Sequence, residues 1–363
     1  RCCIILPKNN NNIKRTDERN ECMYRKRHFP IICALFCAVV SIVLGIGIGS
    51  VNISPGEIFT AIGVRFFGAQ LPEDMPITTV NIITDIRMPR VVLAFLTGAA
   101  LSASGAAVQS VLRNPLASPY TLGVSSGASF GAGLVIAAGF TFLGQFTLAA
   151  AGLVFALLTM FAAVAFTSRI DKNFESSTIV LTGMVLSLFI SAIVNIMANL
   201  AGEKYKQILK WQTGSFSGRG WSSCAVVAVV SVICIFIYMR RSKELDLMSF
   251  GDEQAASAGI DPADTRRFLL IIMSVLTGTA VAFSGVIGFV DMIAPQIVRR
   301  IFGAKHSVVI PMSAVVGGTF MVICDIAART VTAPSELPVG TVTALVGAPF
   351  FAYVFFKKRR NSQ

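Results

Sequence analysis

About ten runs of apolar residues, each long enough to cross a lipid bilayer as a helix, constrain this chain more than any other feature. Backbone groups cannot bond to water inside a bilayer, so we expect each run to form a helix. The predicted fold class is an all-α polytopic membrane protein. The eighth span is the weakest, because Gly285, Gly288 and Pro295 interrupt it. The predicted spans lie at about 29–49, 90–112, 121–142, 146–167, 178–200, 222–239, 268–285, 286–301, 308–328 and 339–356.

The composition leaves little room for a large soluble domain. Apolar side chains make up 54% of the chain and charged ones 14%, whereas soluble domains contain about 25% charged residues. The net charge is +12, but the basic residues lie in short clusters between apolar runs. We therefore predict a chain surrounded by membrane lipid, with no nucleic-acid partner.

The basic residues also predict an orientation. If the N-terminus is cytoplasmic, the inner segments from Met23 onward hold eighteen Lys or Arg and the outer segments hold eight. This bias agrees with the positive-inside rule, so both termini are predicted to be cytoplasmic. Residues 1–22 are polar and Asn-rich, and we expect them to be disordered or non-native. The predicted membrane domain is 23–360.

A short pattern occurs twice. Leu96-Thr97-Gly98-x-Ala100-x-x-x-Ser104-Gly105 in the second span returns as Leu276-Thr277-Gly278-x-Ala280-x-x-x-Ser284-Gly285 in the seventh. The predicted topology sends these two spans in opposite directions, as an inverted repeat would. The alternative is chance similarity between small-residue seams, which pack closely in any membrane bundle.

The segment between the second and third spans carries unusual backbone residues. Asn114, Pro115, Pro119 and Gly123 stop the helix and permit tight backbone geometry near the membrane surface. We interpret them as a structural loop. One alternative remains, a rigid re-entry turn that contacts no ligand.

The longest inner segment, 240–267, predicts a short helix. Asp252 and Glu253 favour a helix start, and Gly259 favours its end. So short a helix must dock, either on the inner face of the bundle or on a separate cytoplasmic protein. The candidate docking residues are Gly251, Asp252, Glu253, Ala256 and Gly259.

Three arginines at predicted outer helix ends oppose the orientation bias: Arg87, Arg90 and Arg329. They either pair locally, Arg329 with Asp325 and Arg87 with Asp85, or bind carboxylates of an extracellular partner.

Asp291 is a carboxylate in an apolar run, where charge is costly and usually functional. It either lines a substrate path or carries a proton, or else it lies at a shallow position near the outer surface. The sequence contains no phosphate-binding Gly-x-x-x-x-Gly-Lys-Ser/Thr loop, no hydrolytic triad and no Cys-x-x-Cys pair. We therefore predict a transport protein without enzymatic activity or a metal site, to which another subunit delivers any energy from ATP.

Several separated blocks together resemble the FecCD-type permease subunits of ABC importers for iron-siderophores, haem and cobalamin. The resemblance covers about 23–360. The blocks are Arg87-Met-Pro-Arg90, Gly98-Ala-Ala-Leu-Ser-Ala-Ser-Gly105, Gln109, Asn114-Pro-Leu-Ala-Ser-Pro119, Leu122-Gly-Val-Ser-Ser-Gly-Ala128, Gly285-x-Ile-Gly-Phe-Val290, Ala294-Pro295, Arg299, Asp325-x-x-x-Arg329, Glu336-Leu-Pro-x-Gly340 and Gly347-Ala-Pro-x-Phe351.

The resemblance implies the type II ABC importer architecture, a homodimer of ten-helix subunits in the bacterial cell (inner) membrane. Two cytoplasmic ATPase subunits would bind ATP and Mg, this chain would hold no cofactor, and an extracytoplasmic binding protein would deliver the substrate. By this analogy the segment at about 244–267 couples to the ATPase, and Arg87, Arg90 and Arg329 receive the binding protein.

The same analogy places a cytoplasmic gate at Ser176 and Ser177 and lines the path with the fifth, eighth and tenth spans. The eighth span contains Asp291 and Gln296. Related chains commonly have Gly at the position of Asp291 and His at the position of Gln296, so substrate contacts along the eighth span do not transfer. The alternative function is a proton-coupled secondary transporter that uses Asp291.

Overall fold

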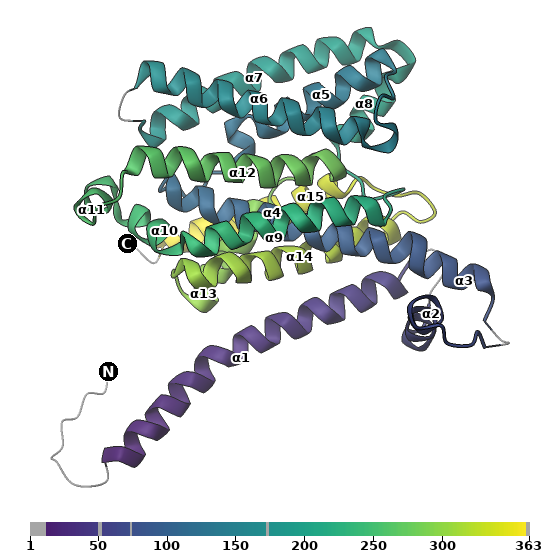
Figure 1. Cartoon of the computed structure of the whole chain (residues 1–363), viewed down its shortest axis with the longest axis horizontal. Helices are drawn as coiled ribbons and strands as arrows, with labels where there is room; N and C mark the ends of the chain where they lie inside the picture. The colour runs from purple at the N-terminus through teal and green to yellow at the C-terminus, as the bar shows by residue number, and fades with distance from the viewer. Residues whose placement is uncertain (1–11, 50–52, 73–74, 172–173, 361–363) are drawn as a thin grey trace.

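The computed structural model describes residues 12–49, 53–72, 75–171 and 174–360, and within these ranges it contains helices and no strands (Figure 1). The α-helices are α1 (Asn12–Gly47), α2 (Pro55–Phe67), α3 (Ile77–Asn81), α4 (Met88–Val111), α5 (Val124–Ala138), α6 (Thr147–Ile170), α7 (Ser176–Leu200), α8 (Tyr205–Gln212), α9 (Trp221–Arg240), α10 (Ser242–Phe250), α11 (Asp252–Ser257), α12 (Pro262–Ser284), α13 (Val290–Phe302), α14 (His306–Thr330) and α15 (Val339–Arg360). The π-helical turn η1 (Ile82–Arg87) joins α3 to α4, and the short 3₁₀ turns are η2 (Pro119–Leu122), η3 (Gly144–Phe146) and η4 (Gly202–Lys204).

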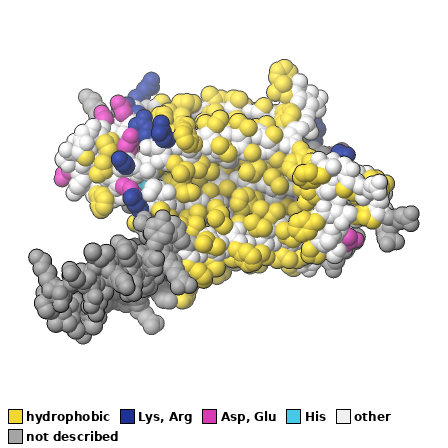
Figure 2. All heavy atoms as spheres, turned by 60° about the horizontal axis from the view of Figure 1, so that its bottom comes forward, with side chains coloured by type: hydrophobic (Ala, Val, Ile, Leu, Met, Phe, Trp, Pro, Cys, Tyr) yellow, Lys and Arg dark blue, Asp and Glu magenta, His cyan; other side chains and the backbone are white. Residues whose placement is uncertain are grey.

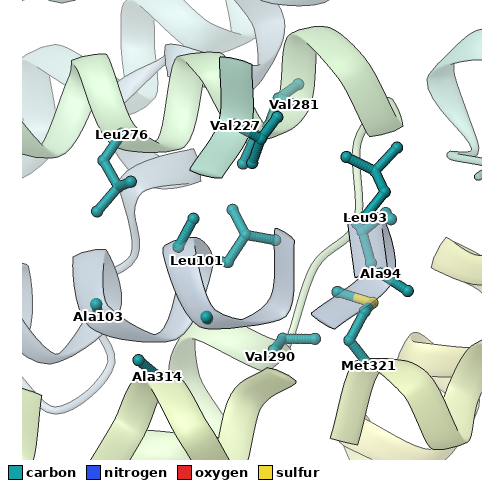
Figure 3. Close-up of a cluster of buried hydrophobic side chains, with 14 of the residues drawn as sticks. Leu93, Ala94, Leu101, Ala103, Val227, Leu276, Val281, Val290, Ala314 and Met321 are labelled. Atoms are coloured by element: carbon teal, nitrogen blue, oxygen red, sulfur yellow. The ribbon is translucent and has the colours of Figure 1, made fainter. Parts of the chain in front are cut away.

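Helix α4 is the centre of the bundle. It packs against α9, α12, α13 and α14, and every residue from Thr97 to Val111 is buried. Figure 3 shows Leu93 and Leu101 of α4 among Val227, Leu276 and Met321 from neighbouring helices. Small residues on α4 allow this close packing, because they let helix backbones approach one another.

A broad apolar band crosses the face of the bundle shown in Figure 2, with many acidic and basic side chains gathered beyond one edge of the band. Large apolar side chains that face outward include Leu188 of α7, Val232 of α9 and Leu345 of α15. Such a band on a monomer indicates contact with lipid hydrocarbon or with another membrane subunit. The chain is thus a multi-pass membrane protein.

Seven helical stretches of the described chain are long and apolar enough to span a bilayer, and α5 and α15 contribute shorter apolar helices. The predicted eighth span differs from expectation. Its helix, α13, has 13 residues, about 20 Å at 1.5 Å per residue, so it covers only part of a bilayer about 30 Å thick. Gly285 has φ +77° and ends α12, and the chain enters α13 at Val290.

Helices α10 and α11 lie at one end of the bundle, and α2, α3 and α8 lie at the other (Figure 1). We call the first the inner end and the second the outer end, after the predicted orientation. Helix α4 starts at the outer end and α12 starts beside α11 at the inner end. The two copies of the repeated pattern therefore run in opposite directions, as predicted.

The predicted N-terminal segment 1–22 is described only in part. Residues 1–11 lie outside the described residues, and 12–22 belong to the first turns of α1. This stretch has neither Gly nor Pro, and a helix already formed by the apolar run extends at low cost into such a sequence.

Candidate functional site

The inner end is organised around Arg266 of α12, whose side chain is fully buried. Its Nη2 donates to Asp252 Oδ1 at 2.7 Å, and its Nη1 donates to the Phe174 carbonyl at 2.7 Å. Its Nε donates to the carbonyl of Val111, the last residue of α4, at 3.4 Å. One guanidinium therefore joins α11, α12, the end of α4 and the residue pair that precedes α7.

Helix α11 has the ends that the sequence predicts. Asp252 and Glu253 lie in its first turn, and Gly259, with φ +82°, follows its last turn. Ala255 is buried, whereas Glu253 and Ala256 are exposed. Both alternatives for docking are therefore open to this helix: one side contacts the bundle through Asp252, and the other is free to contact a partner.

The predicted gate lies next to this junction. Ser176 and Ser177 begin α7, two residues after the carbonyl that Arg266 holds. The Ser176 Oγ is buried without a hydrogen-bond partner in the described part of the chain, and the exposed Ser177 Oγ donates to Glu175 at 3.5 Å. A shift of α11 would thus reach the start of α7 through a single side chain.

A second polar connection starts at Asp246 of α10. Its Oδ1 accepts from the backbone N–H of His306 at 2.9 Å and contacts Nδ1 of the same histidine at 2.5 Å. The other ring nitrogen of His306 contacts Ser110 Oγ of α4 at 2.5 Å. The Arg299 guanidinium of α13 also donates to Ser110, at 3.1 Å.

The connection continues towards Asp291. Arg299 donates from Nη1 to Gln109 Oε1 at 2.5 Å, and Gln109 Nε2 donates to the backbone carbonyl of Asp291 at 3.2 Å. The backbone of Asp291 also lies so close to Gly105 that a Cβ there would overlap the Asp291 carbonyl oxygen. Both α4 residues lie in the inner half of α4, so the alternative of a shallow outer position for Asp291 is wrong.

The Asp291 carboxylate is 1% exposed and is held by the structural loop. Ser118 Oγ donates to Asp291 Oδ2, while Oδ1 has no hydrogen-bond partner within the described residues. Tyr120 Oη donates to the Ile287 carbonyl at 2.7 Å, and Gln296 Nε2 donates to the Pro115 carbonyl at 3.3 Å. The loop thus packs on the start of α13 and brings together residues that the sequence singled out separately.

The loop itself has the tight geometry predicted for it. Asn114 Oδ1 accepts from the Leu116 N–H at 2.9 Å, and Pro119 begins the 3₁₀ turn η2. Gly123 has φ +89°, which favours glycine, and starts α5.

At the outer end, the three arginines bind groups within the chain. Arg87 Nη1 donates to the carbonyls of Ile46 and Gly47 at 2.9 and 3.0 Å, and Arg329 Nη2 donates to that of Gly45 at 2.6 Å. These bonds occupy carbonyls at the end of α1, where helix geometry leaves them without partners.

Arg90 completes this outer cluster. It pairs with Asp325 at 2.9 Å and with Glu336 at 2.7 Å, and Asp325 also pairs with Arg329 at 3.2 Å. The predicted local pair of Arg329 and Asp325 is confirmed, whereas Asp85 pairs with Arg65 of α2, at 3.4 Å. The three arginines are only 7–8% exposed, so in this conformation they hold α1, α4 and α14 together.

Between α5 and α7 lies a cavity of about 200 Å³ whose lining is polar but uncharged. Val194 and Val286 line it beside seven residues with hydroxyl or amide groups: Ser125, Ser126, Ser129, Ser187, Ser191, Asn195 and Gln212. We call it the serine cavity. Neither Asp291 nor Gln296 lines it. Among the described residues, no group of three or more His, Cys, Asp or Glu is arranged to hold a metal ion.

Sequence reasoning missed five polar residues that join these elements: Asp246, Gln109, Arg266, Arg299 and His306. Gln109 and Arg299 belong to the blocks of the family resemblance, which marked their positions but not their contacts. The other three offered no periodic or spacing signal, since their partners lie far away in sequence.

Most of the chain is similar to known transport proteins. The model of the FecCD transport family matches residues 37–357. An uncharacterised ABC transporter permease, YvrB of Bacillus subtilis, is 39% identical over 93% of this chain and 96% of the relative. The Fe(3+)-citrate import permease YfmE of the same organism is 35% identical, over 93% and 98%. The cobalamin import permease BtuC of Halobacterium salinarum is 36% identical, over 79% and 77%.

A solved structure is also similar. It is described as an inward-facing conformation of a metal-chelate type ABC transporter, with 30% identity, a TM-score of 0.79, and coverage of 91% of this chain and 100% of the other. The family model and these relatives match along most of the chain. This chain belongs to the FecCD transport family, whose members are permease subunits of ABC transporters.

Proposed function

We propose that this chain moves a metal chelate into the cytoplasm by alternating access, driven by two separate cytoplasmic ATPase subunits. The observation that carries this proposal is the Arg266 junction, which links α11 at the inner end to α12, to the end of α4 and to the start of α7. ATP and Mg would be bound by the ATPase, and the chain would work as a homodimer with both termini in the cytoplasm.

The surface proposed for ATPase docking is the exposed side of the segment at about 244–267. Phe250 is 72% exposed at the tip of α10, directly before Gly251. An aromatic side chain of this kind, beside the exposed Glu253 and Ala256, is typical of a protein interface. Movement of this surface would be transmitted through Asp252 to Arg266.

The proposed docking site for the binding protein is the outer cluster of Arg87, Arg90 and Arg329. The accessible partner of this cluster is Glu336, whose side chain is 41% exposed while it pairs with Arg90. A carboxylate on the binding protein would exchange with Glu336 for Arg90. Such an exchange needs little new desolvation, because the guanidinium is already buried against acidic groups.

The cargo class follows from the relatives. Their names include permeases for Fe(3+)-citrate, cobalamin, haemin and molybdate, which are all metal-containing complexes or oxyanions. For this chain we propose a metal chelate, which would pass along the serine cavity beside α7. Ser176 and Ser177 would form the inner gate below it.

The test is simultaneous measurement of ATP hydrolysis and chelate uptake in proteoliposomes that hold the whole transporter. Asp252→Asn should keep ATP hydrolysis but lower the chelate transported per ATP several-fold, since the neutral side chain holds Arg266 less strongly. Asp85→Asn makes the same chemical change at the outer end and should leave the ratio unchanged. An unaltered ratio in Asp252→Asn would show that α11 does not transmit movement of the ATPase to Arg266.

A further inference from the structure

A second cavity, of about 360 Å³, lies at the outer end. Helix α8, the loop between α8 and α9, and the end of α12 contribute its wall, which includes Lys210, Trp211, Ser215, Ser217, Arg219 and Ser284. Ser217 is exposed, so the cavity opens at the surface. We call it the outer cavity.

Two cations of the outer cavity lack counter-ions. Among the described residues, no Asp or Glu oxygen lies within 4.0 Å of the charged nitrogens of Lys210 or Arg219. Lys210 is exposed, whereas Arg219 is half-buried and burial lowers the pKa of its guanidinium. Burying a cation without an anion is unfavourable, so an anion that entered the cavity would be stabilised there by Arg219.

The other donors suit the same ligand. The indole N–H of Trp211 is buried and has no acceptor in the described part of the chain, and the Ser215 and Ser217 hydroxyls are further donors in the wall. A guanidinium binds a carboxylate through two parallel hydrogen bonds, which adds orientation to attraction. The cavity therefore offers charge and donors for an anion that carries carboxylates.

The outer cavity and the serine cavity lie on two sides of one backbone seam. Trp211 and Gly285 line the first, and the next residues, Gln212 and Val286, line the second. At this seam, in the wall of the outer cavity, the Ser215 N–H donates to the Ser284 carbonyl at 2.8 Å.

The seam is also bonded to the start of α15. The Val339 and Gly340 N–H groups donate to the carbonyls of Gly214 and Thr213 at 3.2 and 3.1 Å. A ligand that moved between the two cavities would have to part these short contacts. The seam thus separates a cationic outer compartment from an uncharged inner one.

We propose that the outer cavity is a binding site for an anionic, carboxylate-bearing metal chelate, held by Lys210 and Arg219 before it passes the seam. The proposal rests on the proposed transport function and adds the charge class of its cargo. Strong attraction acts at the outer entrance, while the uncharged serine cavity beyond the seam binds more weakly and permits onward release.

The experiment uses the full chain in phosphatidylcholine nanodiscs, without ATPase or binding protein. Trp211 and Trp221 are the two tryptophans, so Trp221→Phe leaves Trp211 as the sole fluorescent reporter. The probes are gallium(III) citrate, which is anionic, and a neutral gallium(III) trihydroxamate. Equilibrium dialysis with radioactive gallium gives binding independently of fluorescence.

We expect saturable binding of gallium citrate, a change in Trp211 emission and weaker binding at high salt. Lys210→Gln and Arg219→Gln should each raise the Kd about tenfold, through loss of a charge-assisted contact. Lys206→Gln removes an exposed cation from the same helix, outside the cavity, and should leave the Kd unchanged. The neutral chelate should bind at least about tenfold more weakly.

Three results would overturn the proposal. They are absence of gallium citrate binding in dialysis, equal binding by the Lys210→Gln/Arg219→Gln double variant, and equal binding of the neutral chelate. A fourth result would be occupation of the outer cavity by a lipid headgroup. In phosphatidylglycerol nanodiscs, the emission of Trp211 would then change without chelate, and gallium citrate would no longer bind. All four leave ATP-driven uptake of a neutral chelate as a separate test of the transport function.

Discussion

Arg266 donates a hydrogen bond of 2.7 Å to Asp252, although the arginine is fully buried in the bundle and the aspartate begins a largely exposed helix. The same guanidinium holds the carbonyl of Phe174, just before α7. A force applied to α11 therefore has a direct, hydrogen-bonded route into the membrane domain.

Arg266→Gln should destabilise the inner end. The shorter neutral side chain cannot reach all three acceptors, and a buried group left without a hydrogen bond costs about 1–3 kcal/mol. The measurement is the shift in thermal unfolding midpoint of the purified chain in detergent. Lys243→Gln, at an exposed position of α10, should change the free energy of unfolding by less than about 0.5 kcal/mol. An equal shift of the midpoint in both variants would mean that the Arg266 hydrogen bonds do not stabilise the inner end.

Gly105→Ala should loosen the contact of α4 with α13. A methyl group there would overlap the Asp291 carbonyl, which α13 holds in place, and overpacking of this kind costs about 1–3 kcal/mol. Gly63→Ala is the matched control: it lies within α2, where the nearest atom to an added Cβ is 3.6 Å away. There alanine should stabilise the helix by up to about 1 kcal/mol. In thermal unfolding, we expect the midpoint temperature to fall in Gly105→Ala and to rise in Gly63→Ala. A rise in both variants would contradict the close contact of Gly105 with Asp291.

Asp291→Asn should preserve ATP-driven uptake to within about threefold. An amide oxygen can still accept the Ser118 hydrogen bond, so the contact between the loop and α13 survives at a cost of about 1 kcal/mol. The measurement is initial uptake rate in proteoliposomes that contain the ATPase. If Asp291 instead carried a proton during transport, the substitution would abolish uptake, because an amide side chain cannot take up and release a proton as a carboxylate does.

Glu336→Gln should strengthen docking of the binding protein, and Arg90→Glu should weaken it. The first variant frees Arg90 from a competing carboxylate at the surface, which we expect to lower the Kd several-fold. The Kd is measured by surface capture of the binding protein on nanodiscs. Reversed or absent effects would mean that the outer cluster has only an internal structural role.

The helices and the local motifs were predictable from the sequence because their signals are local. Apolar runs marked most of the long helices, and the four-residue spacing of Asp325 and Arg329 predicted a pair that the structure confirms at 3.2 Å. The ends of α11 were also correct, since acidic residues and glycine act on the adjacent backbone.

The long-range contacts were not predictable in this way. Arg90 and Asp325 are 235 positions apart, and nothing in either neighbourhood indicates the other. Asp291 was misplaced in one alternative, because α13 begins within the bundle and not at the outer surface. Its depth is set by Gly105 on another helix, which hydropathy along the chain does not report.

The most direct test of the account compares chelate accumulation in two sets of proteoliposomes, one with this chain and its ATPase and one with this chain alone. We predict accumulation only in the first set, dependent on ATP and unaffected when the proton gradient is collapsed. Accumulation by the chain alone, driven by an imposed proton gradient, would contradict the central claim that transport is powered by a separate subunit.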